Sequence, residues 1–476
     1  MKQRIVRSQE FASQGGKYVL YWMQQAQRVH FNFALDYAIA EAASRKLPLI
    51  IAFVISDAIP QAEPKHFRFM LEGICELAAE LQREKADFRI YAGDPVQIIG
   101  KLARDASLLV LDHGYLKWQR AWREAIFERL ESTNIVELDT EAVVPVHIAS
   151  HKEEYSAATL RRKLLKILPD YLSFTQPSRP YPAMVAGGAL LKDQFTGDLA
   201  NFGELWSFAK KTLHLPDVEA YPQFTGGYCA AQKKLREFKA QKLVHYSEFR
   251  NHPELDIQSD ISPYLHFGQI SALDLICQVK DDEDAFDLRA LIADRKTLEG
   301  AQLNLADWLE ELIVRRELSM NFCSYNEHYD NFASLPAWAK ATLLNHLHDP
   351  RERGYTLSDL ENAATTDVYW NAAQMQMVKS GKMHNYMRMY WGKRVLAWFD
   401  NVEEAYEVLL HLNNKHELDG RGANAYAGVA WCFGKHDRPW AQRPIYGMVR
   451  YMNDKGLKRK FNMPSYLRKV ANGELQ

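Results

Sequence analysis

The first third of the 476-residue chain alternates short apolar runs with segments of helical periodicity. The apolar runs YVLYWM (Tyr18–Met23) and LIIAFVI (Leu49–Ile55) enclose an Ala- and Leu-rich segment, Phe31–Arg45. A wholly apolar run of this length is typical of a strand that is buried on both faces, and such strands are joined in parallel through helices. The alternation therefore predicts a parallel sheet with helices on both faces.

The same alternation continues to residue 138. We predict further helices at Phe69–Glu84, Val96–Arg104 and Trp118–Leu130, and further strands at Phe88–Tyr91, Ser107–Asp112 and Ile135–Leu138. This part of the chain contains no GxGxxG motif and no P-loop, so a ligand at the strand ends would fit the fold but is not marked by a motif. We assign residues 17–172 to this Rossmann-like α/β domain.

The chain changes character after this domain. TQPSRPYP, AGG and FTGG lie among short helical pieces in residues 173–229, and such runs mark loops, so we expect a long interdomain linker there. After about Ala230 helical periodicity is almost unbroken, most clearly at Leu288–Met320, Ala372–Trp398 and Val402–Leu412. We therefore predict an all-α C-terminal domain over residues 230–476.

The charge is distributed unevenly along the chain. The net charge is −1, but from Arg421 onwards there are 11 Lys and Arg against 3 Asp and Glu, a balance of +8. A basic end on a neutral protein predicts an anionic partner on one face, although a merely solvated basic surface would look the same.

Cysteine usage and the N-terminus bear on the compartment. The five cysteines are widely spaced and form no CxxC pair, which favours a reducing compartment over a disulfide framework and predicts no metal site. The N-terminus lacks an apolar signal-peptide core, and no stretch is long and apolar enough to span a membrane. We expect a cytoplasmic protein, associated with the nucleoid in a prokaryote or nuclear in a eukaryote, with no membrane partner.

The second half carries a series of ordered motifs. They are ISPYLHFGQIS (Ile261–Ser271), WLEELIVRREL (Trp308–Leu318), NFCSYN (Asn321–Asn326), GKMHNYMRMYW (Gly381–Trp391), LDGR (Leu418–Arg421), YAGVAW (Tyr426–Trp431) and HDRPW (His436–Trp440). In this order they resemble the photolyase/cryptochrome superfamily, and the NFCSYN, MYW and RYMN pieces resemble class II cyclobutane-pyrimidine-dimer photolyases. Two segments depart from the class II pattern: GANAY replaces the usual D-P-N-G-Y, and the loop between Trp431 and His436 is one residue shorter.

The resemblance implies a deoxyribodipyrimidine photolyase, a carbon–carbon lyase that repairs cyclobutane pyrimidine dimers in light. An electron passes from excited, anionic reduced FAD to a dimer flipped out of UV-damaged double- or single-stranded DNA, and it returns after the ring splits. A monomer is expected. Class II relatives can carry a deazaflavin as antenna chromophore, but no local motif here decides between a deazaflavin, a folate and none.

The resemblance also implies a set of FAD-binding residues: Tyr246, Ser259, Ser262, Gln269, Asn385, Arg388 and Asp419. Hydroxyls at a turn into a helix that begins with Pro263 suit a diphosphate, although ordinary helix capping is the alternative. In the family Arg388 and Asp419 pair beside the flavin, where a fixed cation favours the anionic reduced ring. Asn413 stands where class II enzymes place an amide at the reactive flavin nitrogen.

Two tryptophans in the predicted helical segment Ala372–Trp398 share a helix face. Trp391 and Trp398 are seven residues apart, about 10 Å along a helix axis, a spacing that also suits plain core packing. The resemblance implies that electrons pass from the surface to the flavin through Trp398, Trp370 and Trp391, in that order.

For the lesion, the resemblance places Glu311 against the dimer, where a carboxyl group can hydrogen-bond a pyrimidine carbonyl and steady the radical anion. The alternative is an i,i+4 salt bridge from Glu311 to Arg315 on a solvated helix face. The remaining residues expected to contact the dimer or the DNA backbone are Arg250, Asn251, Met389, Trp431, Arg438 and Arg450.

Three other functions were weighed against repair of this lesion. A cryptochrome-like blue-light receptor without repair activity would be expected to carry a long C-terminal extension, whereas this chain ends at Gln476. A (6-4) photolyase needs a pocket His for proton transfer, and the helix around Glu311 has none. An inactive DNA-binding scaffold would bind no flavin.

Overall fold

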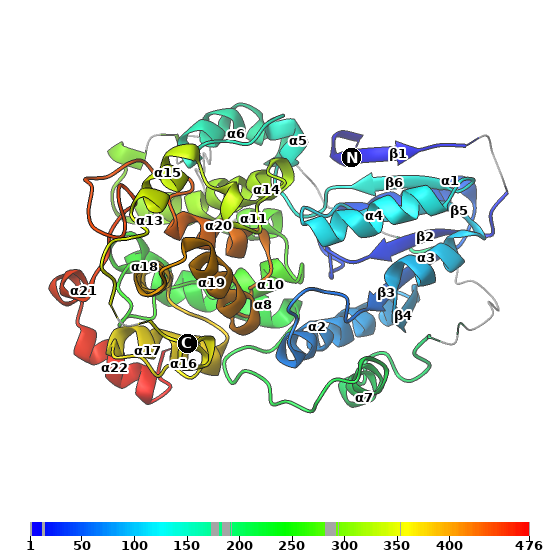
Figure 1. Cartoon of the computed structure of the whole chain (residues 1–476). Coiled ribbons are helices and arrows are strands. Elements are labelled where there is room, and N and C mark those ends of the chain that lie inside the picture. The colour runs from blue at the N-terminus through cyan, green and yellow to red at the C-terminus, as the bar shows by residue number, and fades with distance from the viewer. Residues whose placement is uncertain are drawn as a thin grey trace.

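The computed structural model describes residues 2–11, 15–172, 180–182, 191, 193–280, 292–293, 295–352 and 354–475. A six-stranded sheet lies at one end of the molecule and a body of helices at the other (Figure 1). The strands are β1 (Ile5–Gln9), β2 (Tyr18–Met23), β3 (Leu49–Ile55), β4 (Asp87–Ala92), β5 (Ala106–Asp112) and β6 (Asn134–Leu138), in the spatial order β1-β6-β5-β2-β3-β4. An α/β domain followed by a mainly helical domain is therefore confirmed as the fold.

Strands β2 and β3 match their predicted bounds, β4 and β5 lie within one residue of theirs, and the edge strand β1 was not predicted. β2 and β3 coincide with the two apolar runs and are buried along their whole length. All neighbouring strands pair in parallel except β1, which runs antiparallel to β6. The sequence of β1, IVRSQ, is polar at the edge of the sheet and partly exposed, so it carries no apolar signal.

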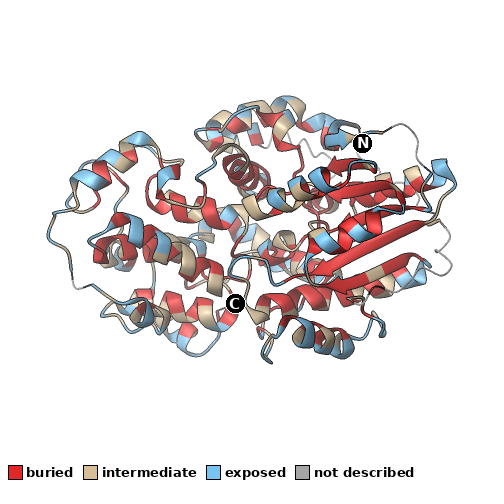
Figure 2. Cartoon of the chain, turned by 45° about the vertical axis from the view of Figure 1, so that its right-hand side comes forward, coloured by how far each residue is buried: buried red, intermediate tan, exposed pale blue. Residues whose placement is uncertain are grey.

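Helices cover both faces of the sheet, as predicted. Helices α1 (Phe33–Arg45) and α2 (Pro64–Arg83) pack on the face that carries Val19, Tyr21 and Met23. Helices α3 (Pro95–Ala103) and α4 (Lys117–Arg129) cover the opposite face, where Leu20 and Trp22 point. Figure 2 shows the central strands largely buried and the covering helices buried on one side. Successive side chains of a strand point to opposite faces, so both layers form from one apolar run.

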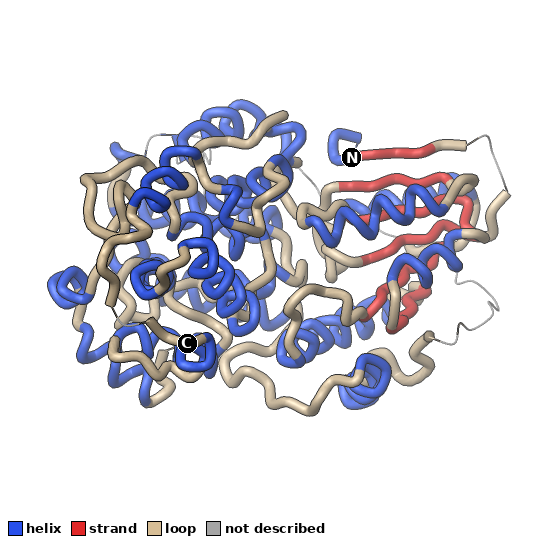
Figure 3. The backbone as a smooth tube through the Cα atoms, viewed as in Figure 1, coloured by secondary structure: helices blue, strands red, loops and turns tan. Residues whose placement is uncertain are grey.

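The predicted linker contains a helix. Helix α7 (Phe202–Leu213) packs beside α2 and contributes Leu205 and Trp206 to the core on that face of the sheet. From α7 the chain continues as an extended segment along the outside of the molecule (Figure 3). Most of TQPSRPYP and all of AGG lie outside the described residues. The linker bounds of 173–229 stay a prediction.

Helices α5 (Val146–Ala149) and α6 (Ala157–Leu172) follow the sheet. Leu160 and Leu164 of α6 lie in the same apolar cluster as Trp308 and Leu309 of the helical body. The last helix assigned to the first domain therefore packs against the second, and the boundary at residue 172 also stays a prediction.

The helical body is built mainly from the helices that follow α7 along the chain. Its helices are α8 (Tyr228–Glu237), α9 (Tyr246–Phe249), α10 (Ser262–His266), α11 (Ala272–Lys280), α13 (Gly300–Leu309), α14 (Arg316–Tyr325), α15 (Ala337–Asn345), α16 (Leu357–Glu361), α17 (Val368–Ser380), α18 (Asn385–Trp398), α19 (Val402–His416), α20 (Ala423–Cys432), α21 (Asp454–Lys460) and α22 (Met463–Ala471). In the part of the chain that is described, no helix has both the length and the apolar character needed to cross a lipid bilayer.

Two predicted helices differ in detail. The predicted helix Ala372–Trp398 is in fact two, because Gly381 adopts a left-handed conformation (φ +73°) that ends α17, and α18 starts in a new direction. The predicted start at Leu288 lies outside the described residues, and the segment from Gly300 to Tyr325 runs through α13, a π-helical turn at Glu310–Arg315 and α14.

Buried backbone contacts join the sheet to the helical body. Arg28, in the loop after β2, donates to the backbone oxygens of Gly268 (2.9 Å) and Thr140 (2.6 Å). Gly268 has φ +67°, and a Cβ atom there would collide with the backbone oxygen of Gln25. The close approach of the two halves therefore requires glycine at this position.

Replacing Gly268 with alanine is expected to lower the free energy of unfolding by about 2–3 kcal/mol, because the methyl group clashes with backbone and the φ angle is unfavourable. Thermal or denaturant unfolding measures the change. Gly428→Ala is the matched control, because a Cβ atom at Gly428 in α20 meets nothing within 4 Å and alanine favours a helix. Equal stability of the two variants would contradict the steric argument.

Candidate functional site

The loop before α10 is tied to the start of α18. Gln258 donates to the backbone oxygen of Arg250 (2.7 Å) and lies 3.4 Å from the ring of His384, the N-cap of α18. Asp260, in a left-handed conformation, is buried and ion-paired with Lys382 and Lys242. The backbone on either side of the predicted Ser259 is thus fixed against the M-H-N motif.

An ion pair lies between α18 and the segment after α19. Arg388 Nη2 is 3.2 Å from Glu417 Oε1, and the Glu417 side chain is 1% exposed. The predicted partner, Asp419, instead accepts a hydrogen bond from the hydroxyl of Ser262. The expected direct Arg388–Asp419 pair is therefore not what the structure has, because the neighbouring Glu417 reaches the guanidinium. Together with Asn385, exposed one turn before Arg388, these groups form what we call the polar corner.

Charge in the polar corner is strongly perturbed. Burial raises the pKa of the Glu417 carboxyl to about 8, although Arg388 acts in the opposite direction. Burial lowers the pKa of Arg388, but the Glu417 and Asp419 carboxylates outweigh it and raise the pKa overall. A cation whose pKa is raised by nearby carboxylates stays charged and is able to stabilise an anionic ligand.

Two buried donors in this region have no hydrogen-bond partner among the described residues. They are Nε of Arg388 and Nε2 of Gln374, the residue whose amide oxygen accepts the indole N–H of Trp391. Buried donors are usually satisfied, so these two indicate a missing acceptor. A flavin, whose ring edge offers carbonyl and nitrogen acceptors, fits them.

The other predicted cofactor residues are placed differently. Asn413 is buried in the last turn of α19, and its backbone oxygen accepts from Glu417 N–H (3.0 Å). Tyr246 is buried beneath Arg250. Gln269 is fully buried with its amide bonded to the backbones of Gly227 (2.8 Å) and Phe69 (3.3 Å), so it joins the linker to α2 and is not brought to the polar corner.

The three predicted relay tryptophans lie in sequence. The rings of Trp391 and Trp370 are stacked with centroids 6.0 Å apart, and those of Trp370 and Trp398 meet edge to face at 5.3 Å. Trp370 therefore stands between the other two, although it comes from α17. Trp398, expected at the surface, is only 3% exposed, because Arg394 and the half-buried Tyr355 cover its ring.

The π-helical turn at Glu310–Arg315 presents Glu311. Arg250 Nη1 donates to Glu311 Oε1 at 3.0 Å, and Arg315 pairs instead with Glu310 at 3.4 Å. The alternative Glu311–Arg315 salt bridge is therefore absent. The structure brings together two of the predicted lesion residues, Arg250 and Glu311, and places exposed Asn251 next to them. Single π-helical turns are frequent at functional sites.

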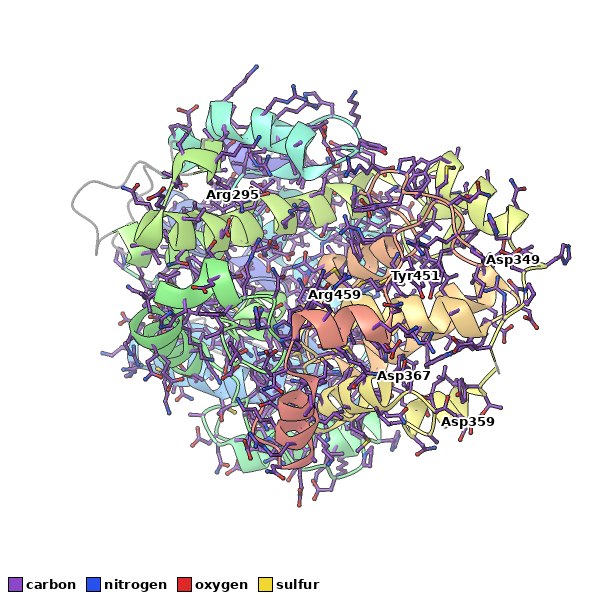
Figure 4. The ribbon with its side chains drawn as sticks, turned by 90° about the vertical axis from the view of Figure 1, so that its left-hand side faces the viewer. Arg295, Asp349, Asp359, Asp367, Tyr451 and Arg459 are labelled. Carbon is purple, nitrogen blue, oxygen red and sulfur yellow. The ribbon has the colours of Figure 1, made fainter. Side chains whose placement is uncertain are left out.

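A cavity of about 320 Å³ holds three more of the predicted lesion residues. Its lining is aromatic, sulfur-containing and cationic: Tyr386, Met389, Trp431, Trp440, Ala441, Arg443, Arg450, Tyr451, Met452 and Lys460. We call it the aromatic cavity. Figure 4 looks onto this face, with Tyr451 in the loop before α21 and Arg459 on α21. Arg438 is exposed and lies over the ring of Trp440, at 5.2 Å.

A second cavity lies at the carboxyl ends of β2, β3 and β5. Aromatic side chains of the sheet half, among them Phe53, Trp118 and Trp122, face His266 and Arg421 of the helical body across it. It is also lined by Gln24 and Gln27, whose amide oxygens are buried without a hydrogen-bond partner among the described residues. We call it the strand-end cavity.

Comparison with known proteins agrees with this arrangement. The DNA photolyase family model matches residues 19–183. A deoxyribodipyrimidine photo-lyase from Methanothermobacter thermautotrophicus is 42% identical over 455 residues, covering 96% of this chain and 95% of that protein. The chain belongs to the photolyase family. The expected superfamily and an enzyme of the photolyase kind are thus confirmed.

Further relatives show how far the likeness extends. A photo-lyase from Arabidopsis thaliana is 36% identical over 464 residues, covering 95% of this chain and 89% of that protein. An archaeal photolyase from Sulfolobus tokodaii, solved with two FAD molecules, has a TM-score of 0.67 at 14% identity, covering 95% of this chain and 89% of that one. At this low identity the second comparison supports the photolyase fold alone.

Sequence reasoning missed several residues of the candidate site. Glu417 directly precedes the LDGR motif, which was the available signal, but its sequence neighbours are mostly polar and do not mark it as buried. Gln374 lies within a helical segment, and no motif in the sequence marks it. Lys393 is fully buried beneath Trp431, 5.3 Å from the ring centroid, and burial lowers its pKa to about 8. No pattern in the sequence distinguishes such a lysine from a surface one.

Glu417→Gln is expected to change how stability depends on pH. The folded carboxyl holds its proton up to about pH 8, whereas the unfolded one releases it near its ordinary value of 4.5, so this group loses stabilisation as pH rises between these values. The melting temperature of the flavin-free variant, relative to the parent, should therefore rise between about pH 6 and about pH 9.

Any constant cost of leaving Arg388 without its partner cancels in this comparison of two pH values. Glu407→Gln, at an exposed position of α19, is the control and should leave the pH dependence unchanged. A difference between variant and parent that is the same at both pH values would show that Glu417 is ionised throughout.

Proposed function

We propose that this chain is a class II photolyase that repairs cyclobutane pyrimidine dimers in UV-damaged DNA in light. The observation that carries the proposal is the shared helix α18. It bears Trp391 at the inner end of the tryptophan series, Arg388 in the polar corner and Met389 in the aromatic cavity. One rigid element thus links a candidate electron path, a candidate cofactor site and a candidate lesion site.

FAD, when bound, supplies the excitable electron donor for this chemistry. Arg388 would hold positive charge beside the ring and favour the anionic reduced form, with Glu417 holding its guanidinium in place. Ser262 would offer its hydroxyl, and Ser259 its turn, to the diphosphate. Asn385 and Asn413 would face the ring as amide donors. Arg388 Nε, a buried donor without an acceptor, is the feature of the chain that supports this assignment.

The aromatic cavity suits a flipped dimer. Met389 and Trp431 offer an apolar floor and wall, while Arg450, 5.4 Å from the Trp431 ring centroid, and Arg438 at the rim would contact the DNA backbone or the gap left by the dimer. Glu311, held by Arg250, would hydrogen-bond a pyrimidine carbonyl. Extrusion into such a pocket exposes the lesion to the donor, and double- or single-stranded DNA can supply it.

A second chromophore would fit the strand-end cavity. Its aromatic walls suit a flat ring, and the unpartnered amide oxygens of Gln24 and Gln27 would accept hydrogen bonds from it. The solved Sulfolobus tokodaii photolyase with two FAD molecules shows that this fold can hold a second ring system. A deazaflavin, a folate and a flavin remain alternatives for this position.

The direct test is repair of UV-irradiated oligo(dT) by the flavin-loaded, chemically reduced protein. Dimers should disappear in blue or near-UV light and persist in the dark. Bound flavin without light-dependent loss of dimers would favour the cryptochrome-like alternative, and purification without flavin would favour the DNA-binding scaffold.

Glu311→Ala is expected to lower repair per absorbed photon while the flavin spectrum stays unchanged. Losing a hydrogen bond to a charged species costs about 1.5–3 kcal/mol, which is on the order of 10- to 100-fold in rate if that step limits. Glu311→Gln, which keeps size and some hydrogen-bonding capacity, should fall in between. Glu327→Ala, at an exposed position beyond α14, is the matched control. Parental quantum yield in Glu311→Ala would remove this residue from catalysis.

Arg450→Ala is expected to weaken binding to dimer-containing DNA and to reduce the slope of log affinity against log salt by roughly one unit, because one phosphate contact is lost. Arg83→Ala removes the same charge from an exposed position at the end of α2 and should leave both quantities unchanged. Binding titrations at several salt concentrations measure them. An unchanged slope with weaker binding would place Arg450 in the DNA gap and away from phosphate.

A further inference from the structure

The three tryptophans differ in the group that accepts their indole N–H. Trp370 Nε1 donates to the backbone oxygen of Trp391 at 3.1 Å, and Trp391 Nε1 donates to the amide oxygen of Gln374 at 3.0 Å. Both acceptors are neutral. Trp398 Nε1 donates to a carboxylate oxygen of Glu352 at 3.3 Å. The outermost indole of the series is therefore bonded to a negative charge.

A compact charge network surrounds Trp398. Arg394 lies 5.0 Å from its ring centroid and is held by Glu352 (2.6 Å) and by Asp367 (2.8 Å). Asp367 also accepts a hydrogen bond from Tyr390, and it is labelled in Figure 4 beside α18. Two carboxylates against one guanidinium leave this network with one negative charge. The bond from Arg394 lowers the pKa of Glu352, which keeps that carboxylate ionised.

Trp431, one of the two tryptophans that line the aromatic cavity, has the opposite surroundings. Lys393 and Arg450 lie 5.3 and 5.4 Å from the ring centroid of Trp431. Asp437 pairs with Arg450 at 3.0 Å, so the network around Trp431 carries one positive charge. Negative charge near an indole favours loss of an electron and positive charge opposes it. The protein thus makes Trp398 easier to oxidise than Trp431.

We propose that Glu352 is a positioning residue that holds the electron vacancy at Trp398 during light-driven reduction of the flavin. The inference rests on the proposed function, in which the tryptophans form a relay. With flavin bound, Trp391 would give one electron to the light-excited oxidised ring, Trp370 one to Trp391 and Trp398 one to Trp370. Trp398 is left one electron short, as a radical cation, and the flavin is one electron richer.

The proton of the oxidised indole stays on Nε1, in its hydrogen bond to Glu352. A carboxylate already bonded to Arg394 is a weak base, so the bond stabilises the radical cation without removing the proton. A thiolate in solution would then give one electron to Trp398 and become a thiyl radical, so that the electron passed on by Trp391 would not need to return. Without the negative charge, the vacancy would spend more time on Trp370 and Trp391, where the electron can return from the flavin.

Glu352→Gln tests the proposal, because glutamine keeps the size and an acceptor oxygen and removes only the charge. Flash photolysis of the oxidised, flavin-loaded protein should show a shorter lifetime of the tryptophan radical and a lower yield of reduced flavin. The expected change is on the order of two- to fivefold, since the Glu352 side chain is 57% exposed and solvent screens its charge. Repair by chemically reduced protein should stay at the parental level.

Asp400→Asn is the matched control. Asp400 lies just beyond the same helix end, is 96% exposed and pairs with Arg351 at 3.8 Å. Its removal takes away one carboxylate near Trp398 but not the hydrogen bond, so radical lifetime and flavin yield should equal those of the parent.

The bond itself is read out in the flavin-free protein. The indole N–H resonance of Trp398, assigned by its loss in Trp398→Phe, should shift in Glu352→Gln and not in Asp400→Asn. Either an unshifted resonance, or a shifted resonance with parental radical lifetime and flavin yield, would overturn the proposal. Trp370→Phe distinguishes failure of the relay from failure of the role of Glu352. If this variant photoreduces its flavin at the parental rate, the relay itself is wrong. If its photoreduction is blocked while Glu352→Gln keeps the parental radical lifetime and flavin yield, only the role of Glu352 is refuted.

Discussion

The hydrogen bond from Leu418 N–H to the carbonyl of Gly381, 2.7 Å long, fixes the two segments on which the site depends. Gly381 ends α17 in a left-handed conformation, and a Cβ atom there would meet the ring of Tyr221. Because Leu418 directly follows Glu417, the bond sets the start of α18 against the acidic segment after α19. The Arg388–Glu417 pair and the helix that carries Trp391 both follow from this junction.

The sign of the charges that surround α18 changes along its length. Towards its start, Arg388 is surrounded by acidic groups. Lys393 lies one turn after Met389, which lines the aromatic cavity. It is buried under Trp431 and donates to the backbone oxygen of Cys432. At its end, Trp398 faces the carboxylate of Glu352. The charge of the buried Lys393 acts more strongly than it would in water, whereas solvent screens Glu352, whose side chain is 57% exposed. The helix therefore orders anionic and cationic surroundings along the same path that electrons are proposed to follow.

Local sequence pattern was enough to predict the central strands of the sheet, but it could not predict which residues pair with the charged side chains of the site. β2 and β3 were predicted to the residue because strands buried on both faces are continuous apolar runs, whereas the polar edge strand β1 gave no such signal. The helix break at Gly381 lay inside a periodic segment, and a single glycine is tolerated in many helices. Resemblance placed Arg388 and Glu311 in the site, but Glu417 and Arg250 were recognised as their partners only in three dimensions. Each of those pairs joins residues from different segments, and sequence spacing contains no such information.

The polar corner is also a place where the chain gives up stability. Glu417 is removed from water, Arg388 is largely so, and Nε of Arg388 is buried with no acceptor among the described residues. A buried ion pair of this kind rarely stabilises a fold more than apolar side chains of the same shape would. A ligand that accepts from Arg388 would relieve the cost only in the folded state, so its binding would raise the stability of the protein by mass action. The polar corner is therefore better explained as a site prepared for a cofactor than as an element that holds the fold together. The sheet and the apolar clusters of the helical body supply the stability that offsets the cost of burying these charged groups.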